Sequence, residues 1–131
     1  MITSFDLNAI GRILLSAGSA LNARVNTDID SLDFHQIQQM TNTAQNLIIK
    51  SKALFAQATI LMETTIQDAI DGLSAASDDI NKVIKKVANV QDAINIAGSL
   101  VTLAADILGQ NFGSIPDDAQ AIIDDIQSFN S

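Results

Sequence analysis

Residues that could carry catalysis or bind a metal are scarce in this 131-residue chain. It has no cysteine, and its only histidine and only glutamate, His35 and Glu63, lie far apart in the sequence. A carboxylate-bridged di-iron bundle needs several glutamates and two histidines at Glu-x-x-His spacing. Thiolate metal sites, cysteine nucleophiles and di-iron chemistry are therefore excluded.

Three aspartates cluster in one short polar stretch, at Asp28, Asp30 and Asp33. An EF-hand loop beginning at Asp28 would need an acid or amide at its fifth position, glycine at its sixth and glutamate at its twelfth. Those positions hold Leu32, Asp33 and Gln39, so the match fails. Loop solvation and helix capping explain these acids, and we expect no bound metal and no cofactor.

Six further aspartates are sequence neighbours, namely Asp78/Asp79, Asp117/Asp118 and Asp124/Asp125. Adjacent residues on a helix point about 100° apart, so these pairs are not poised for acid–base catalysis. The sequence also contains no glycine-rich phosphate-binding motif and no nucleophile-elbow motif. We therefore expect a protein that is not an enzyme.

The net charge of −8 is unevenly distributed. Residues 1–27 contain two arginines and one aspartate, a sum of +1, whereas residues 28–131 contain five lysines and fourteen acids, a sum of −9. An acidic surface repels phosphate backbones and anionic lipid headgroups. We expect no nucleic-acid partner and no simple electrostatic binding to membranes.

The elements that carry these residues are predicted to be helices. One proline and six glycines are too few for a many-turned β fold, and apolar residues recur at steps of three and four. We predict an all-α, single-domain protein over 1–131, built as an elongated up-down four-helix bundle. Two long central helices, at about 32–72 and 77–108, form a projecting hairpin, and shorter helices at about 4–22 and 116–128 pack at one end.

Within the helix predicted at 32–72, apolar residues form two stripes. The main stripe, expected in the core, comprises Phe34, Ile37, Ala44, Ile48, Phe55, Ala58, Met62, Ala69 and Leu73. A heptad-like seam lies on the opposite face and comprises Ile49, Ala53, Ala56 and Ile60. Either another helix of the same monomer covers this seam, or it is the interface with a second copy or another protein.

Gly11 and Gly18 lie seven residues apart, on one side of the helix predicted at 4–22. Each glycine costs about 1 kcal/mol relative to alanine in a helix interior. We infer close helix packing on this side, with another backbone approaching it. Tight packing inside the monomer is enough to explain it.

The stretch from Ala93 to Leu108 begins with thirteen uncharged residues. Polar residues in and beside it form one narrow strip along a helix, comprising Asp92, Asn95, Ser99, Thr102 and Asp106. Thirteen residues span about 20 Å, less than the roughly 30 Å hydrocarbon core of a bilayer. We expect a helix packed in the core; the alternative is a pore-type helix with lipid around it and water along the strip.

These observations favour a non-enzymatic helical-bundle protein that acts through protein–protein contacts, with itself as the expected partner. The alternative is a membrane-active protein that exposes residues 93–108 after a conformational change. The apolar run from Ile10 to Ala20 has no basic segment before it and contains Arg12, unlike a signal peptide. We therefore expect a cytoplasmic protein, or one secreted without a cleaved signal peptide.

Overall fold

The structure is a computed structural model that describes residues 2–130. Over these residues the chain forms six α-helices and one two-stranded ribbon. The elements are β1 (Ile2–Asp6), α1 (Asn8–Thr27), α2 (Phe34–Gln57), β2 (Thr59–Glu63), α3 (Thr64–Ala75), α4 (Ser77–Lys86), α5 (Val90–Leu108) and α6 (Ile115–Asn130). The predicted all-α class is confirmed.

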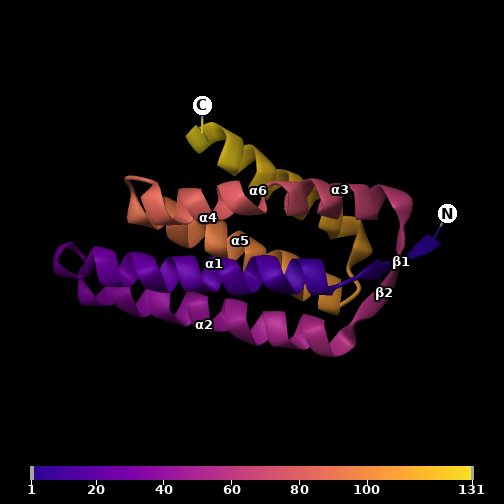
Figure 1. The fold of residues 1–131 in the computed structure, drawn as a ribbon, viewed down its shortest axis with the longest axis horizontal. Coiled ribbons are helices and arrows are strands. Elements are labelled where there is room, and N and C mark those ends of the chain that lie inside the picture. The colour runs from indigo at the N-terminus through magenta and orange to yellow at the C-terminus, as the bar shows by residue number, and fades with distance from the viewer. Residues whose placement is uncertain (1, 131) are drawn as a thin grey trace.

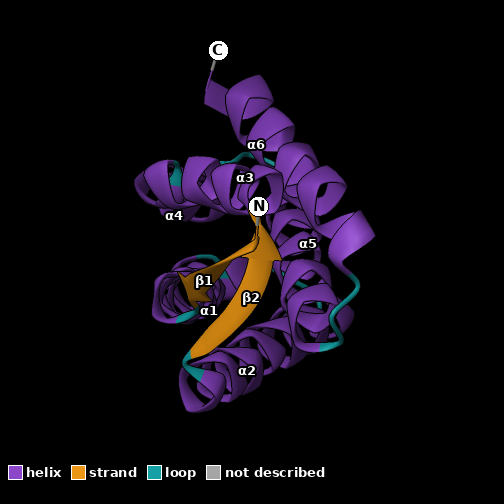
Figure 2. Cartoon of the chain, turned by 90° about the vertical axis from the view of Figure 1, so that its right-hand side faces the viewer, coloured by secondary structure: helices purple, strands orange, loops and turns teal. Residues whose placement is uncertain are grey.

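The helices α1 and α2 form an antiparallel hairpin that a short β ribbon closes at its open end (Figure 2). β1 precedes α1, β2 follows α2, and the two strands pair antiparallel from Ile2 opposite Glu63 to Asp6 opposite Thr59. One face of the ribbon points into the core and carries Thr3, Phe5, Ile60 and Met62. The ribbon therefore ties the N-terminal segment to the chain that leaves α2.

The second half of the chain forms a layer over this hairpin (Figure 1). From β2 the chain runs back along the hairpin as α3 and then α4, and it reverses into α5. α5 packs on α2 and α1 below and on α4 and α6 above, so its apolar face lies inside the molecule. α6 lies across α3 and α5, and its C-terminal half passes over α4.

The helix predicted at 32–72 is wrong in its continuity, because α2 ends at Gln57 and β2 follows. Ala58 has a positive φ of 65°, a conformation in which the helix cannot continue, and its N–H donates to the carbonyl of Leu54. The next residues alternate between exposed and buried, as a strand packed on one face does. The helix predicted at 4–22 likewise begins late, at Asn8, because residues 2–6 are paired in β1.

The helix predicted at 77–108 consists of two helices, α4 and α5. Val87 adopts an extended conformation that ends α4, and the side chain of Asn89 accepts a hydrogen bond from the N–H of Gln91 to begin α5. The chain therefore reverses at 87–89. The long projecting hairpin is replaced by compact packing of α5 against the first two helices.

The two glycines of α1 face α2 at close range. A Cβ atom at Gly11 would lie 2.6 Å from Cε1 of Phe55. A Cβ at Gly18 would lie 3.2 Å from the carbonyl oxygen of Ala44 and 3.3 Å from a side-chain carbon of Ile48. The missing side chains thus allow α1 and α2 to pack against each other along most of their length.

Arg24, near the end of α1, is the only ionisable side chain buried among the described residues, with 7% of its surface exposed. Its Nε pairs with the carboxylate of Asp28, and its Nη1 donates to the carbonyl of Ile84 over 3.1 Å. Ile84 lies in the last turn of α4, where carbonyls have no partner within the helix. Arg24 therefore caps α4 from the other layer of the molecule.

We predict that Gly11→Ala and Gly98→Ala change stability in opposite directions. Alanine is favoured in both helices by up to about 1 kcal/mol, and at Gly98 the added methyl meets no packed atom within 4 Å. At Gly11 the clash with Phe55 should outweigh that gain, giving a net loss of about 1–3 kcal/mol. Urea unfolding followed by far-UV circular dichroism measures both, and a stabilised Gly11→Ala variant contradicts the close packing.

We predict that Arg24→Met lowers the free energy of unfolding by about 2–4 kcal/mol, because the Ile84 carbonyl loses its buried donor and Asp28 its partner. The matched control is Arg12→Met, which removes an exposed arginine from the same helix and should change stability by no more than about 0.5 kcal/mol. Equal losses in the two variants would show that Arg24 has no capping role.

Candidate functional site

The seam predicted on the second helix is divided by the structure. Ile49, Ala53 and Ala56 lie exposed on α2, with 54% of the Ile49 surface accessible. Ile60 lies in β2, is 9% exposed and belongs to the core opposite Phe5. The predicted interface is therefore wrong for Ile60, since the chain is no longer helical there, while the other three residues share an uncovered helix surface.

The sequence prediction is also wrong for Phe34. It belongs to the stripe expected in the core, but 77% of its surface is exposed. It occupies the first position of α2, directly after Asp33, which caps the helix by accepting from the N–H of Gln36. At 100° per residue, Phe34 falls within about 60° of several other exposed residues of α2. We call this surface the α2 outer face; it comprises Phe34, Gln38, Thr41, Gln45, Ile49, Lys52 and Ala56.

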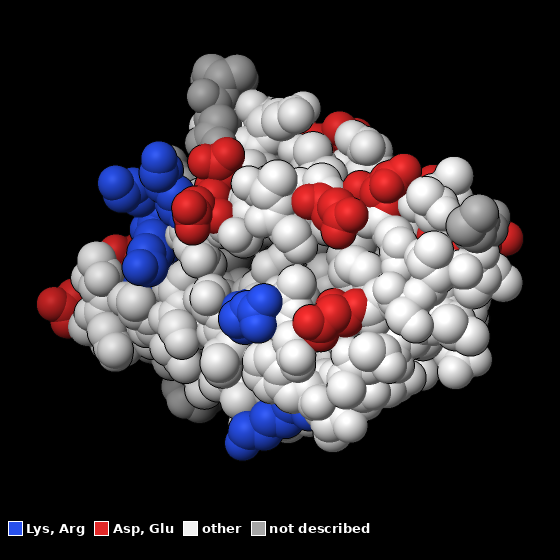
Figure 3. All heavy atoms as spheres, turned by 45° about the vertical axis from the view of Figure 1, so that its right-hand side comes forward, with Lys and Arg blue, Asp and Glu red and all other residues white. Residues whose placement is uncertain are grey.

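The α2 outer face differs in charge from the outer surfaces of α3 and α6, which expose several aspartates. No acidic residue occurs between Asp33 and Glu63, whereas the chain as a whole carries fifteen. Figure 3 shows acidic side chains from the top of the visible face to its middle, and a basic side chain at its lower edge, where α2 lies. This surface can therefore approach another protein without the repulsion between carboxylates expected at α3 and α6.

The stretch 93–108 lies in α5 and faces inward. Its apolar side chains are buried against the neighbouring helices, from Ala93 and Ile94 at one end to Ala104 and Ile107 at the other. Across residues 2–130, no helix combines the length and the apolar character needed to cross a bilayer.

The predicted polar strip of α5 lies along the surface, and each of its residues is half-buried or exposed. Ser99 donates to the carbonyl of Asn95, and Thr102 donates to that of Gly98. These hydroxyls are satisfied within the helix. The strip therefore serves as the solvent-facing side of α5.

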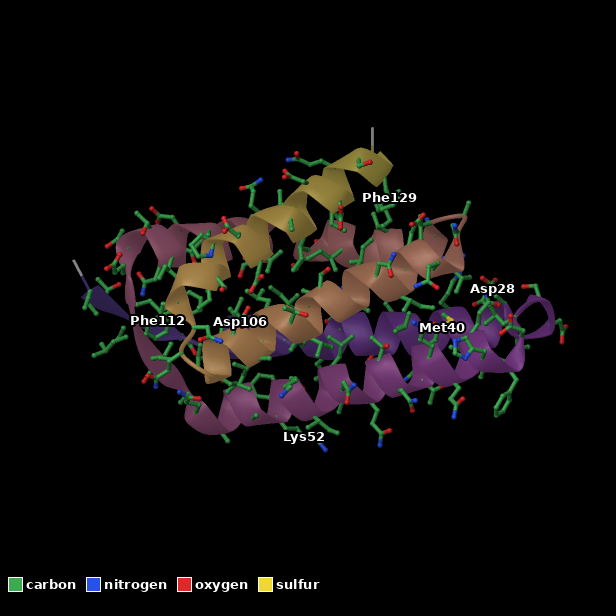
Figure 4. The ribbon with its side chains drawn as sticks, turned by 180° about the vertical axis from the view of Figure 1, so that it is seen from behind. Asp28, Met40, Lys52, Asp106, Phe112 and Phe129 are labelled. Carbon is green, nitrogen blue, oxygen red and sulfur yellow. The ribbon has the colours of Figure 1, made fainter. Side chains whose placement is uncertain are left out.

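Asp106, at the end of the strip, forms a carboxyl–carboxylate pair with Asp118 of α6. Burial and the neighbouring Asp106 raise the pKa of Asp118 from 3.8 to about 6. The pKa of Asp106 is lowered because its carboxylate accepts hydrogen bonds from Asp118 and from Asn111, whose Nδ2 lies 3.2 Å away. A proton bound to Asp118 at pH values below its pKa can therefore bridge the carboxyl groups of α5 and α6. Figure 4 shows Asp106 near the C-terminal end of α5.

Sequence reasoning missed this pair and the buried Arg24. The spacing of residues assigned Asp106 to the strip and Asp118 to the start of the last helix, and nothing in either pattern joins them. Arg24 carries no sign of burial, since arginine is usually exposed. The strand β2 could have been found, because β-branched Thr59 and Ile60 begin a short alternating run.

The other side chains considered for catalysis or metal binding do not come together in the structure. His35 is exposed in the first turn of α2, and Asp28 is engaged by Arg24. The described part of the chain contains no cluster of three or more side chains suited to hold a metal ion. The surface that stands out is the α2 outer face.

We predict that Asp118→Asn stabilises the protein increasingly as the pH rises from about 4 to 6. A carboxyl whose pKa is higher in the folded state binds a proton that the unfolded chain has released, so its contribution is present below pH 4 and lost through pH 6. The side chain of asparagine stays neutral and can donate a hydrogen bond over this whole pH range. Urea midpoints of both proteins between pH 4 and 7.5 test this, with the exposed Asp125→Asn as control; a pH-independent difference contradicts it.

Comparisons of the chain with models of protein families, with curated proteins and with solved structures found no match. The function is therefore inferred from the geometry and chemistry of the surface.

Proposed function

We propose that this is a non-enzymatic helical protein that acts through protein–protein contacts, and that it associates with itself through the α2 outer face. The observation that supports this is the exposure of Phe34 and Ile49, 77% and 54% of their surfaces, on a helix surface without acids. Burying an aromatic or branched aliphatic side chain contributes about 1.5–3 kcal/mol. Two copies bring four such side chains to one contact.

The spacing on α2 suits an antiparallel pair of helices related by a two-fold axis. With the axis beside Gln45, residue numbers facing each other across the contact add up to 90. Phe34 then lies over Ala56 of the second copy, and Ile49 lies over Thr41. A large side chain thus meets a small one at these two positions, while Gln38 faces the long polar side chain of Lys52. Because the axis repeats each contact, one self-complementary patch serves both copies.

The rest of the surface favours this face over others. Exposed acids occur on two helices of the opposite layer, at Asp68 and Asp71 in α3 and at Asp124 and Asp125 in α6. Like charges brought together in a contact are unfavourable. The acids of α3 and α6 therefore disfavour association through those two helices.

We predict that Gln45→Cys forms a disulfide-linked dimer under mild oxidation, because the two-fold axis brings the two copies of this position together. The natural chain has no cysteine, so the introduced thiol is the only one present. Ser19→Cys, exposed on α1, is the matched control and should remain monomeric at the same protein concentration. Non-reducing electrophoresis distinguishes the two.

We further expect Phe34→Asp combined with Ile49→Asp to convert the dimer to a monomer in sedimentation equilibrium, since the contact then buries four carboxylates. Circular dichroism should be unchanged, because both side chains are exposed. A natural chain that stays monomeric at millimolar concentration, or a double variant that still dimerises, rules out association through this face.

A further inference from the structure

A cleft of about 480 Å³ lies where the end of α4, the start of α5 and the end of α6 meet. Its volume is within the range of pockets that hold small organic ligands. The α4–α5 reversal at 87–89 forms one wall, and Phe129 in the last turn of α6 forms the other. Figure 4 shows Phe129 at the end of α6, pointing toward the α4–α5 side of the molecule.

The interior of the cleft is apolar. Val83, Val87, Ala88 and Phe129 supply its hydrocarbon surface. Val83 is buried, Val87 is half-buried, and Phe129 keeps 40% of its surface exposed. An exposed aromatic ring facing a partly open aliphatic floor is a place where an acyl chain would be removed from water on both sides.

The rim of the cleft is basic in an otherwise acidic protein. Three of the five lysines of the chain lie in α4. Lys82 and Lys86 line the cleft, one turn apart, and Asp92 is the one acid beside them. Among the described residues, neither lysine is ion-paired, since the one salt bridge joins Arg24 and Asp28. The cleft therefore combines an apolar floor with two cations free to meet an anion.

We propose that this cleft binds a single-chain amphiphile with an anionic head, such as a medium-chain fatty carboxylate. The acyl chain lies between Phe129 and the Val83–Ala88 wall, and the carboxylate faces the ammonium groups of Lys82 and Lys86. The site is separate from the α2 outer face, so it stands whether or not the protein self-associates.

Titration of the natural chain with sodium decanoate, below the concentration at which decanoate forms micelles, tests the proposal. We expect saturable binding of one decanoate per chain by isothermal titration calorimetry. The methyl resonances of Val83 and Val87 should shift in carbon–proton NMR spectra, with smaller changes in α2. Decyltrimethylammonium, with the same chain and the opposite charge, should bind at least tenfold more weakly.

Two neighbouring lysines provide a matched pair of variants. Lys86→Glu places a negative charge in the cleft, whereas Lys85→Glu makes the same change one residue away, on the side of α4 that faces Leu15 and Ser19 of α1. We expect Lys86→Glu to weaken decanoate binding about tenfold and Lys85→Glu to change it less than twofold. Phe129→Ala should weaken both decanoate and decyltrimethylammonium, because it removes the apolar wall.

Three results would overturn the proposal. The first is the absence of saturable decanoate binding, and the second is equal binding of decanoate and decyltrimethylammonium. The third is an equal effect of Lys85→Glu and Lys86→Glu, which would mean that only the overall charge of the protein matters. Since sedimentation of the same samples reports self-association independently, loss of ligand binding and loss of the dimer can be told apart.

Discussion

The pairing of β1 with β2 is the constraint on which the rest of the fold depends. Five residues at the start of the chain hold five residues that follow α2, so the two-helix hairpin is fixed at both ends. The ribbon stops α2 where it would otherwise continue and delivers the chain to the start of α3. The second layer therefore begins beside the first, and α5 is enclosed instead of projecting from it.

Enclosure of α5 explains how a helix with a long uncharged stretch fits within the core. Its apolar residues face helices on both layers, and its polar residues fall on the one side that remains open. The same packing leaves α2 with a free side, because α1 and α5 cover only its inner surface. The two surfaces of interest thus follow from one arrangement: the α2 outer face is the side not covered, and the cleft lies where α4 turns into α5.

The sequence predicted the helical class and the inward packing of 93–108, since both depend on local periodicity. It could not predict the end of α2 at Ala58, because no glycine or proline marks that position and the break depends on a strand more than fifty residues earlier. The same limit applies to Arg24 and to the Asp106–Asp118 pair. Each of these contacts joins residues on two different helices. The spacing of residues in the sequence indicates only which residues share a face of the same helix.

The bond from Arg24 to the carbonyl of Ile84 has a consequence for the cleft that lies beside it. It anchors the end of α4, the helix that carries Val83 and Lys86 of the cleft wall, to α1. Preorganisation of this kind lowers the entropy lost on binding. The opposite wall is the last turn of α6, where Phe129 keeps 40% of its surface exposed.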